Sequence, residues 1–170
     1  GENLARRVSD VCRLFEQLTT LHKELAALRR RKLEAIGKAD LDAMCACNDE
    51  QEALAKRLAE RTGLRKQLMD VVGREFGITS KEARALTVSQ LMLRLPAELR
   101  PDLERARDEL QTAIHDLAHT NRMGGSVARE LASHLRFVFA AVRPSAIKTG
   151  QYSATGDARE ITACVLEMMG

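Results

Sequence analysis

Apolar residues are spaced most regularly between Pro101 and Arg143, where they recur at alternating steps of three and four. That period is typical of a long helix that packs along its length against other helices. At 1.5 Å per residue such a helix is roughly 60 Å long and cannot bury its apolar side alone. We therefore expect the rest of the chain to supply partner helices. The predicted seam consists of Leu103, Arg107, Leu110, Ile114, Leu117, Asn121, Gly124, Ala128, Leu131, Leu135, Val138 and Val142.

Two earlier stretches carry the same period. Leucine and valine from Leu4 to Leu28 predict a helix over about 3–36, and a thinner stripe predicts a second over about 41–76. Gly37 is a natural helix end and Asp40 a natural N-cap, so the break is placed between them. One continuous helix through Gly37 is the alternative.

The segment 77–100 is expected to form a compact helical crossover. Thr79 and Glu82 have the spacing of a capping box, and Thr87 can begin another short helix that Pro96 stops. Pro101 then suits the first position of the third long helix, where its missing N–H costs nothing.

The chain ends in a tail that follows the third helix, which we expect Pro144 to stop. Ser145 to Gly156 contains serine, threonine and glycine and is expected to be loosely ordered. A short amphipathic helix is predicted over about 158–169, and it must dock on the bundle, on a second copy or on a partner. Its apolar side is formed by Ile161, Cys164, Val165 and Met168.

The predicted fold is all-α: an elongated antiparallel bundle of three long helices (about 3–36, 41–76 and 101–143) with the short crossover between the last two. Residues 1–143 would form the bundle, and residues 144–170 a mobile C-terminal segment. Hydrophobic residues make up 45% of the chain but aromatic residues only 3%, without tryptophan. A core of aliphatic side chains favours helix-on-helix packing over a β-sandwich.

Charge and cysteine usage suggest a reduced, cytoplasmic protein. The net charge is +3, and the one basic run, Arg29 to Lys32, is either a solvated helix end or a patch for an acidic partner. No stacking aromatic residue lies nearby, which disfavours nucleic acid. Cys45 and Cys47 point to opposite sides of a helix, so they cannot share a metal. No apolar run approaches about 18 residues, which disfavours stable membrane insertion.

His115 and His119 form the one arrangement with catalytic character. Two histidines four residues apart share a helix face and can reach one zinc ion. The residue after the first histidine is Asp116, however, where metalloproteases of this spacing have glutamate, and no third ligand is evident. The alternative interpretation is that both are half-exposed helix positions. We expect no enzyme activity, metal or cofactor.

The middle of the third helix carries residues that an optimised core would avoid. Asn121 falls on the predicted seam, where a polar residue fixes register, and Gly124 leaves a notch for a neighbouring helix or a partner side chain. The residues alone favour structure and partner recognition equally. In the tail, Tyr152 lies between two glycines and is either a plain loop residue or an interface anchor.

These features together resemble the FlgN family of flagellar type III export chaperones. The leucine-rich hairpin from Leu14 to Leu68 is similar to that of the family. Asn121 and Gly125 match the family's Asn-x-x-Asn-Gly pattern, with Gly124 in place of the second asparagine. Tyr152 followed by Gly156 matches the pattern after that helix. The likeness covers most of the chain through short motifs.

The resemblance implies a cytoplasmic chaperone that binds the C-terminal helical segments of the hook–filament junction proteins FlgK and FlgL. It would prevent their premature association and deliver them to the flagellar export apparatus, which Tyr152 and Gly156 would contact. A homodimer is left open, and the alternative function is an adaptor bundle for another helical partner. The cargo-binding candidates are Asn121, Gly124, Gly125, Leu131, Leu135, Val138, Val142, Ile161, Val165 and Met168.

Overall fold

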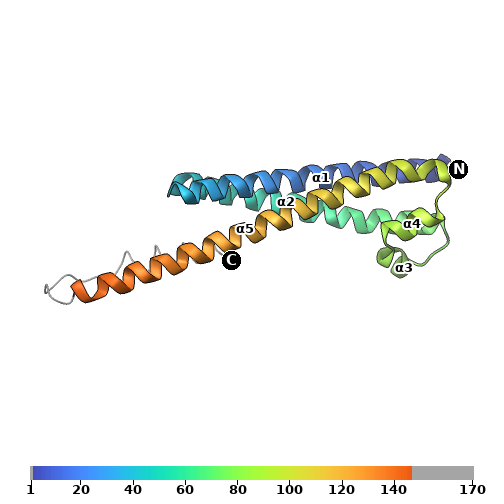
Figure 1. Ribbon diagram of the computed structural model, residues 1–170. Coiled ribbons are helices and arrows are strands. Elements are labelled where there is room, and N and C mark those ends of the chain that lie inside the picture. Colours follow the sequence, from blue (N-terminus) through green and yellow to red (C-terminus); the bar gives the residue numbers. More distant parts are fainter. Residues whose placement is uncertain (1, 147–170) are drawn as a thin grey trace. The chain divides into compact units, whose positions relative to one another are not determined.

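The computed structural model describes residues 2–146, with side chains placed for residues 2–138. All regular structure in this part of the chain is helical, which confirms the predicted all-α class with long helices. The chain divides into two units, Gly1–Thr120 and Asn121–Gly170. The elements are α1 (Glu2–Gly37), α2 (Leu41–Glu75), α3 (Ser80–Ala85), α4 (Val88–Arg94), the short 3-10 helix η1 (Ala97–Leu99) and α5 (Arg100–Ala146) (Figure 1).

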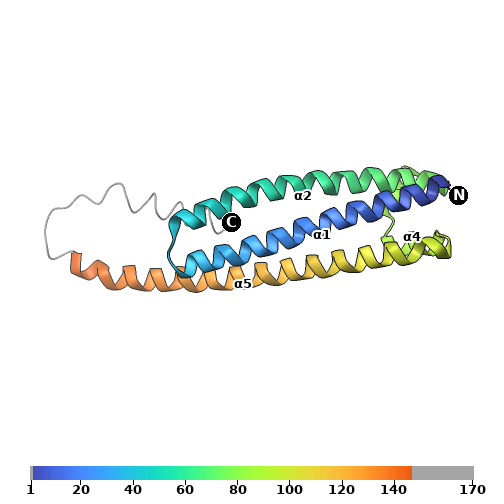
Figure 2. The same cartoon turned by 90° about the horizontal axis from the view of Figure 1, so that it is seen from above.

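In the first unit, α1 and α2 form an antiparallel hairpin and the first part of α5 runs beside α1. Figure 2 shows α1 between α2 and this part of α5, with α1 and α5 running in the same direction. The short helices α3 and α4 connect α2 to α5, as the crossover prediction required. The three long helices therefore run up, down and up.

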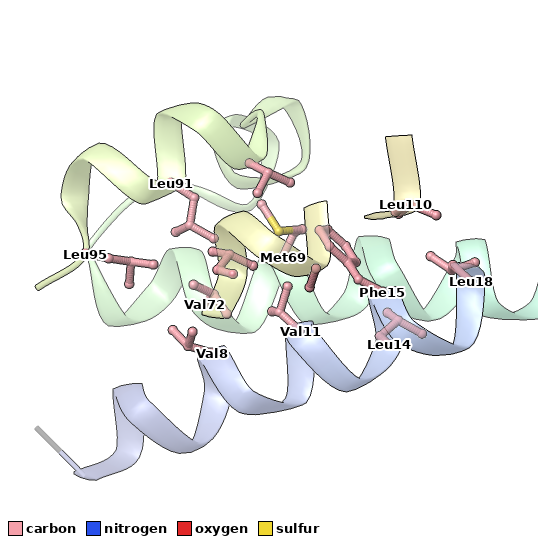
Figure 3. Close-up of a cluster of buried hydrophobic side chains, with 13 residues drawn as sticks. Val8, Val11, Leu14, Phe15, Leu18, Met69, Val72, Leu91, Leu95 and Leu110 are labelled. Carbon is pink, nitrogen blue, oxygen red and sulfur yellow. The ribbon is translucent and has the colours of Figure 1, made fainter. Parts of the chain in front are cut away.

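The core of the first unit lies at the end where the crossover sits. Side chains from α1, α2, the α4 segment and α5 converge there (Figure 3), and Phe15, Leu91 and Leu103 are completely or almost completely buried. The other end of the hairpin has a thinner core, because residues 48–67 of α2 include no buried side chain. The buried cluster consists of Val8, Val11, Leu14, Phe15, Leu18, Met69, Val72, Val88, Leu91, Leu95, Leu103, Ala106 and Leu110.

Helix α3 is held against α2 by a close backbone approach and an ion pair. Gly73 is buried, and a Cβ added there would overlap the Cβ of Ala83 in α3. Beside it, the Arg84 guanidinium donates to the buried Asp70 carboxylate at 3.1 Å. A glycine in the middle of a helix costs stability, and here the cost is offset by the contact with α3 that it permits.

Both short helices begin with complete capping boxes; the one at Thr79 was predicted, and at Thr87 only the start of a helix was. Thr79 accepts from the Glu82 backbone N–H at 3.4 Å, and the Glu82 carboxylate accepts from the Thr79 backbone N–H at 3.2 Å. Hydrogen bonds from Thr79 lower the pKa of the Glu82 carboxyl. Thr87 and Gln90 repeat the arrangement at α4. These caps let helices of six and seven residues begin sharply.

The turn between α1 and α2 confirms the predicted break at Gly37 and the Asp40 cap. The Asp40 side chain accepts from the Ala43 backbone N–H at 3.0 Å. The helix ends in a Schellman motif, since the Asp40 N–H donates to the Ala35 carbonyl and the Ala39 N–H to the Ile36 carbonyl. The left-handed residue is Ala39, with φ +53°, and not Gly37. At the end of α2 the same motif has Gly77 in that position, with φ +67°.

Helix α5 continues slightly further than the sequence pattern indicates. Its last residue is Ala146, whereas Pro144 was expected to stop it. Proline removes one backbone hydrogen bond from a helix, but it has the φ angle that a helix needs, so a final part-turn can pass through it. The predicted end is therefore early by a few residues.

We expect Gly73→Ala to lower the unfolding free energy by about 1–3 kcal/mol, because its methyl group overlaps Ala83 and pushes α3 off α2. The control is Gly63→Ala, in the same helix, where an added Cβ meets nothing within 4 Å. That change should raise stability by about 0.5–1 kcal/mol through helix propensity. Denaturant titrations of both variants check the prediction, and equal effects would contradict the close approach.

Ala39→Gly should raise the unfolding free energy by about 0.5–1 kcal/mol, because glycine adopts the left-handed conformation without a Cβ penalty. Gly77→Ala makes the reverse change at the equivalent position of the second Schellman motif and should lower stability by about 1 kcal/mol. Thermal unfolding followed by circular dichroism measures both. A loss of stability in the Ala39 variant would be inconsistent with a left-handed residue there.

Candidate functional site

The packed seam of α5 differs from the predicted one at its intermediate positions. Leu103 and Leu110 are buried as expected. The buried residues at the positions that alternate with the leucine positions are Ala106, Ala113 and Thr120. The pattern had placed Arg107, Ile114 and Asn121 there. Alanine lets neighbouring helices approach closely, so it occupies a seam position better than the larger Ile114, which is exposed. Arg107 is half-buried and pairs with Glu104 and Asp108.

Asn121 is exposed, so the interpretation that it fixes register inside a buried seam is wrong. Its neighbour Thr120 takes the seam position, and the Thr120 hydroxyl donates to the Asp116 carbonyl at 2.9 Å. That bond satisfies the hydroxyl within the helix. The sequence pattern did not place Thr120 on the buried seam, because a threonine followed by an asparagine is typical of a polar surface.

Burial on α5 ends at Thr120. Between Asn121 and Val138 every side chain described is half-buried or exposed. The seam itself continues in the sequence, because Gly124, Val127, Leu131, Leu135 and Val138 follow at steps of three and four. We call these five residues the apolar stripe. Val127, Leu131 and Val138 are 37%, 40% and 39% exposed, which is unusual for side chains in line with a packed core.

Within the first unit an ion pair joins α1 to α5 near the end of the packed seam. Arg30 of α1 donates to both oxygens of the Asp116 carboxylate, at 2.8 and 2.7 Å. The last buried residue of α5, Thr120, follows Asp116 by four residues, so the apolar stripe begins where the packed seam of the first unit ends.

Further apolar side chains widen this surface. Met123 is exposed and lies beside the apolar stripe in the helical register, four residues before Val127, whereas the exposed Phe137 lies about a quarter turn away from it. Together with Val127 they were missed by sequence reasoning. Val127 could have been found, because it follows Thr120 by seven residues and Ala113 by fourteen.

Gly124 and Gly125, the glycine pair of the predicted site, lie within α5 and are half-buried. A Cβ added at Gly125 would meet only the Arg129 guanidinium, at 3.8 Å. No described neighbour therefore requires glycine at position 125, and the pair lowers helix stability by roughly 1 kcal/mol per residue. The start of the stripe offers close access to the backbone.

The opposite side of the helix is basic. Arg122, Arg129 and Arg136 recur every seventh residue, and all are exposed. Within the part of the chain that the structure describes, no ion pair joins Arg122 or Arg129 to another side chain. The second part of α5 is thus amphipathic, with apolar residues on one side and solvated cations on the other.

The basic run after Leu28 lies at an exposed helix end and takes part in ion pairs between helices of the first unit. Arg30 pairs with Asp116 of α5, and Arg31 pairs with Glu50 of α2, and both arginine side chains are more than half exposed. Lys32 is buried, and burial lowers the pKa of its ammonium group, with a smaller contribution from Arg29. Pairing within the chain reduces the charge that this run can present to an acidic partner.

A small cleft separates the N-terminal half of α1 from η1 and the start of α5. Its volume is about 300 Å³, and its lining includes Val8, Cys12, Leu99 and the Asp102–Arg105 ion pair. Burial raises the pKa of the Cys12 thiol, which is therefore protonated at neutral pH and a poor nucleophile. The cleft presents no catalytic arrangement.

The histidine pair gains no further ligand. His115 and His119 are both exposed. Among the residues that the structure describes, no group of three histidine, cysteine, aspartate or glutamate side chains could hold a metal ion. Cys45 is exposed and Cys47 buried, as expected of two residues on opposite sides of a helix.

The structure brings five of the predicted cargo-binding residues onto one stretch of α5 and leaves the tail candidates untested. Val142 is in α5, but its side chain is not described. The remaining candidates, Tyr152, Gly156, Ile161, Val165 and Met168, lie outside the described residues. The five on the described stretch are Gly124, Gly125, Leu131, Leu135 and Val138, with Asn121 at its start.

A comparison with protein families identifies one match that spans nearly the whole chain. The model of the FlgN protein family matches residues 7–160. No curated protein and no solved structure matches the chain. Between residues 2 and 146, no helix has the length and apolar character needed to cross a membrane.

Proposed function

The chain belongs to the FlgN family of flagellar export chaperones, and on that premise we propose that it binds the C-terminal helical segments of the junction proteins FlgK and FlgL. In this proposal the chaperone works in the cytoplasm. It keeps these segments from associating prematurely and delivers them to the flagellar export apparatus.

The observation that carries the proposal is the apolar stripe on α5. It is the continuation of a seam that is buried as far as Thr120, so its side chains are spaced to contact another helix. An amphipathic helix binds such a surface by placing residues at i, i+3, i+4 and i+7 along it. The stripe from Gly124 to Val138 is about 21 Å long, which accommodates about four turns of a cargo helix.

The individual candidates would then have distinct roles. Leu131, Leu135 and Val138 would bury the apolar side of the cargo, and Val142 would extend the surface by another turn. Gly124 and Gly125 lack side chains and would let the cargo backbone come close, while Asn121 offers an exposed amide for a hydrogen bond. The tail residues Ile161, Val165 and Met168 would pack on the outer side of the bound cargo.

A surface of this kind suits a chaperone that must release its cargo. The stripe residues are already about 60% covered within the chain, so each gains only part of the roughly 1.5–3 kcal/mol of a fully buried side chain. Part of that gain is spent on ordering the two partners. We therefore expect micromolar affinity, near −8 kcal/mol, rather than the affinity of a permanent complex.

Leu131→Asp should weaken binding of the FlgK and FlgL C-terminal segments at least tenfold, because it puts a charge in the middle of the apolar stripe. The matched control is Ser133→Asp, which adds the same residue to the exposed, opposite side of the same helix. Calorimetric titration of the full chain with each segment gives the dissociation constants.

Equal weakening by the two aspartate variants would move the cargo site off the stripe. If neither segment binds the unchanged protein, the FlgK and FlgL assignment fails and an adaptor for another helical partner takes its place. Circular dichroism of both variants checks that α5 remains helical.

Tyr152→Ala should leave the cargo dissociation constants unchanged but reduce secretion of FlgK and FlgL, because we assign Tyr152 and Gly156 to contact with the export apparatus. Secreted and intracellular cargo are compared in cells that carry the variant, with Tyr152→Phe as the conservative control. A loss of cargo binding in the purified Tyr152→Ala protein would refute this division of roles.

A further inference from the structure

The apolar stripe needs cover even when no cargo is present. Val127, Leu131 and Val138 are more than a third exposed, and Met123 beside Val127 is 53% exposed. A contiguous apolar surface of this kind promotes association unless something covers it. The chain itself contains one further segment with matching character, in residues 158–169 beyond α5.

The sequence of residues 158–169 provides a complementary apolar side. Ile161, Val165 and Met168 recur at steps of four and three, the spacing of one helix face. They extend over about 10 Å in helical form, whereas Val127 to Val138 extends over about 16 Å. The segment therefore fits within the stripe. A single short helix of this length is marginal in water and gains stability only by docking.

The connection between the two segments has a suitable length for docking within one chain. Eleven residues, 147–157, separate the end of α5 from this segment, and fully extended they reach about 36 Å. Returning from Ala146 to Val127 requires about 28 Å along the helix. The average end-to-end distance of such a flexible linker is about 17–20 Å. This is close to the distance from Ala146 back to Leu135 along α5, where an antiparallel segment would begin.

Net charge adds a long-range attraction to the same pairing, although the arginines lie on the side of α5 opposite the stripe and do not face a docked segment. Between Asn121 and Ala146, α5 contains four arginines and one glutamate, so it is basic. The segment and the residue before it contain Asp157, Glu160 and Glu167 against one arginine, so they are acidic. Two copies of α5 would instead bring two basic helices together, which costs energy at low salt.

From these observations we infer that residues 158–169 of the same chain dock antiparallel on the apolar stripe of α5 when no cargo is bound. This inference rests on the proposed function only because it names cargo as the competitor. Tethering gives the segment an effective concentration near the millimolar range, above that of a second copy in the cell. Cargo then binds by displacing the segment, whose apolar residues become available to the outer side of the cargo.

The test is paramagnetic broadening in the full chain, with a nitroxide attached to the Ala163→Cys variant, because position 163 lies opposite the apolar side of residues 158–169 in the helical register. Cys12 and Cys45 are replaced by serine, and Cys47 and Cys164 by alanine, so that the label has one site. The backbone amide signals of residues 127–138 should lose most of their intensity. Leu131→Asp should restore these signals, and Ser133→Asp should not, because it lies away from the stripe.

Unaffected amide signals would overturn the inference. So would broadening that appears only when labelled chains are mixed with unlabelled isotope-enriched chains, since the occupant is then a second copy. A measurement without cysteine replacements is hydrogen exchange of the unaltered protein. Amides of 127–138 should exchange about tenfold more slowly than in a chain that ends at Ala146, and equal rates would contradict docking.

Adding the FlgK segment separates this inference from the proposed function. If both hold, the segment removes the broadening. If broadening is present and cargo neither binds nor changes it, docking within the chain stands and the cargo assignment fails. If cargo binds but no broadening exists beforehand, the function stands and docking within the chain fails.

Discussion

A helix can bury its apolar side only where another element packs against it, and on α5 that packing ends at Thr120. Just before this point, Arg30 of α1 pairs with Asp116 of α5 within the first unit. Before that point the α5 seam is part of a core. After Thr120 the same three-and-four spacing continues in residues that no described side chain buries. An unburied apolar stripe thus arises from the pattern that also builds the fold.

The first unit is built to hold α5 firmly at one end. Phe15, Leu91 and Leu103 are buried where the crossover meets the long helices, and Gly73 lets α3 approach α2 closely. Toward the α1–α2 turn the core is thinner and polar pairs such as Arg31 with Glu50 connect the helices. Local stability follows buried apolar contacts, so opening should be least frequent near the crossover. Residues 121–138 of α5, with two adjacent glycines and no buried side chain, have less to stabilise them. The proposed cargo surface thus lies on a segment that is less stable than the first unit.

Most of the fold could be predicted from the sequence because helical periodicity is a long-range signal. The long helices, the break before Asp40 and the capping boxes at Thr79 and Thr87 all follow from spacing and local chemistry. The details that failed depend on contacts between helices. Ala106 and Ala113 occupy seam positions because they are small, and Gly73 is retained for its contact with Ala83. The left-handed position at Ala39 rather than Gly37 depends on how the last turn of α1 closes.

The candidate site was predictable in part for the same reason. Leu131, Leu135 and Val138 belong to a recognisable stripe, but a sequence cannot say where along a seam the partner helix stops. Asn121 was therefore placed inside a core that ends one residue earlier, and Val127 was not recognised. The family assignment supplies the kind of partner, which spacing alone does not specify.

The most direct test of the central claim is hydrogen exchange, with and without the bound C-terminal segment of FlgK, of a chain that ends at Ala146, in which residues 158–169 cannot already cover the stripe. If the uncovered seam of α5 receives the cargo, protection should increase over residues 121–138 and remain unchanged over 100–120, where the seam is already packed. Protection confined to α1, α2 or the crossover would contradict the claim and place the cargo elsewhere on the chaperone.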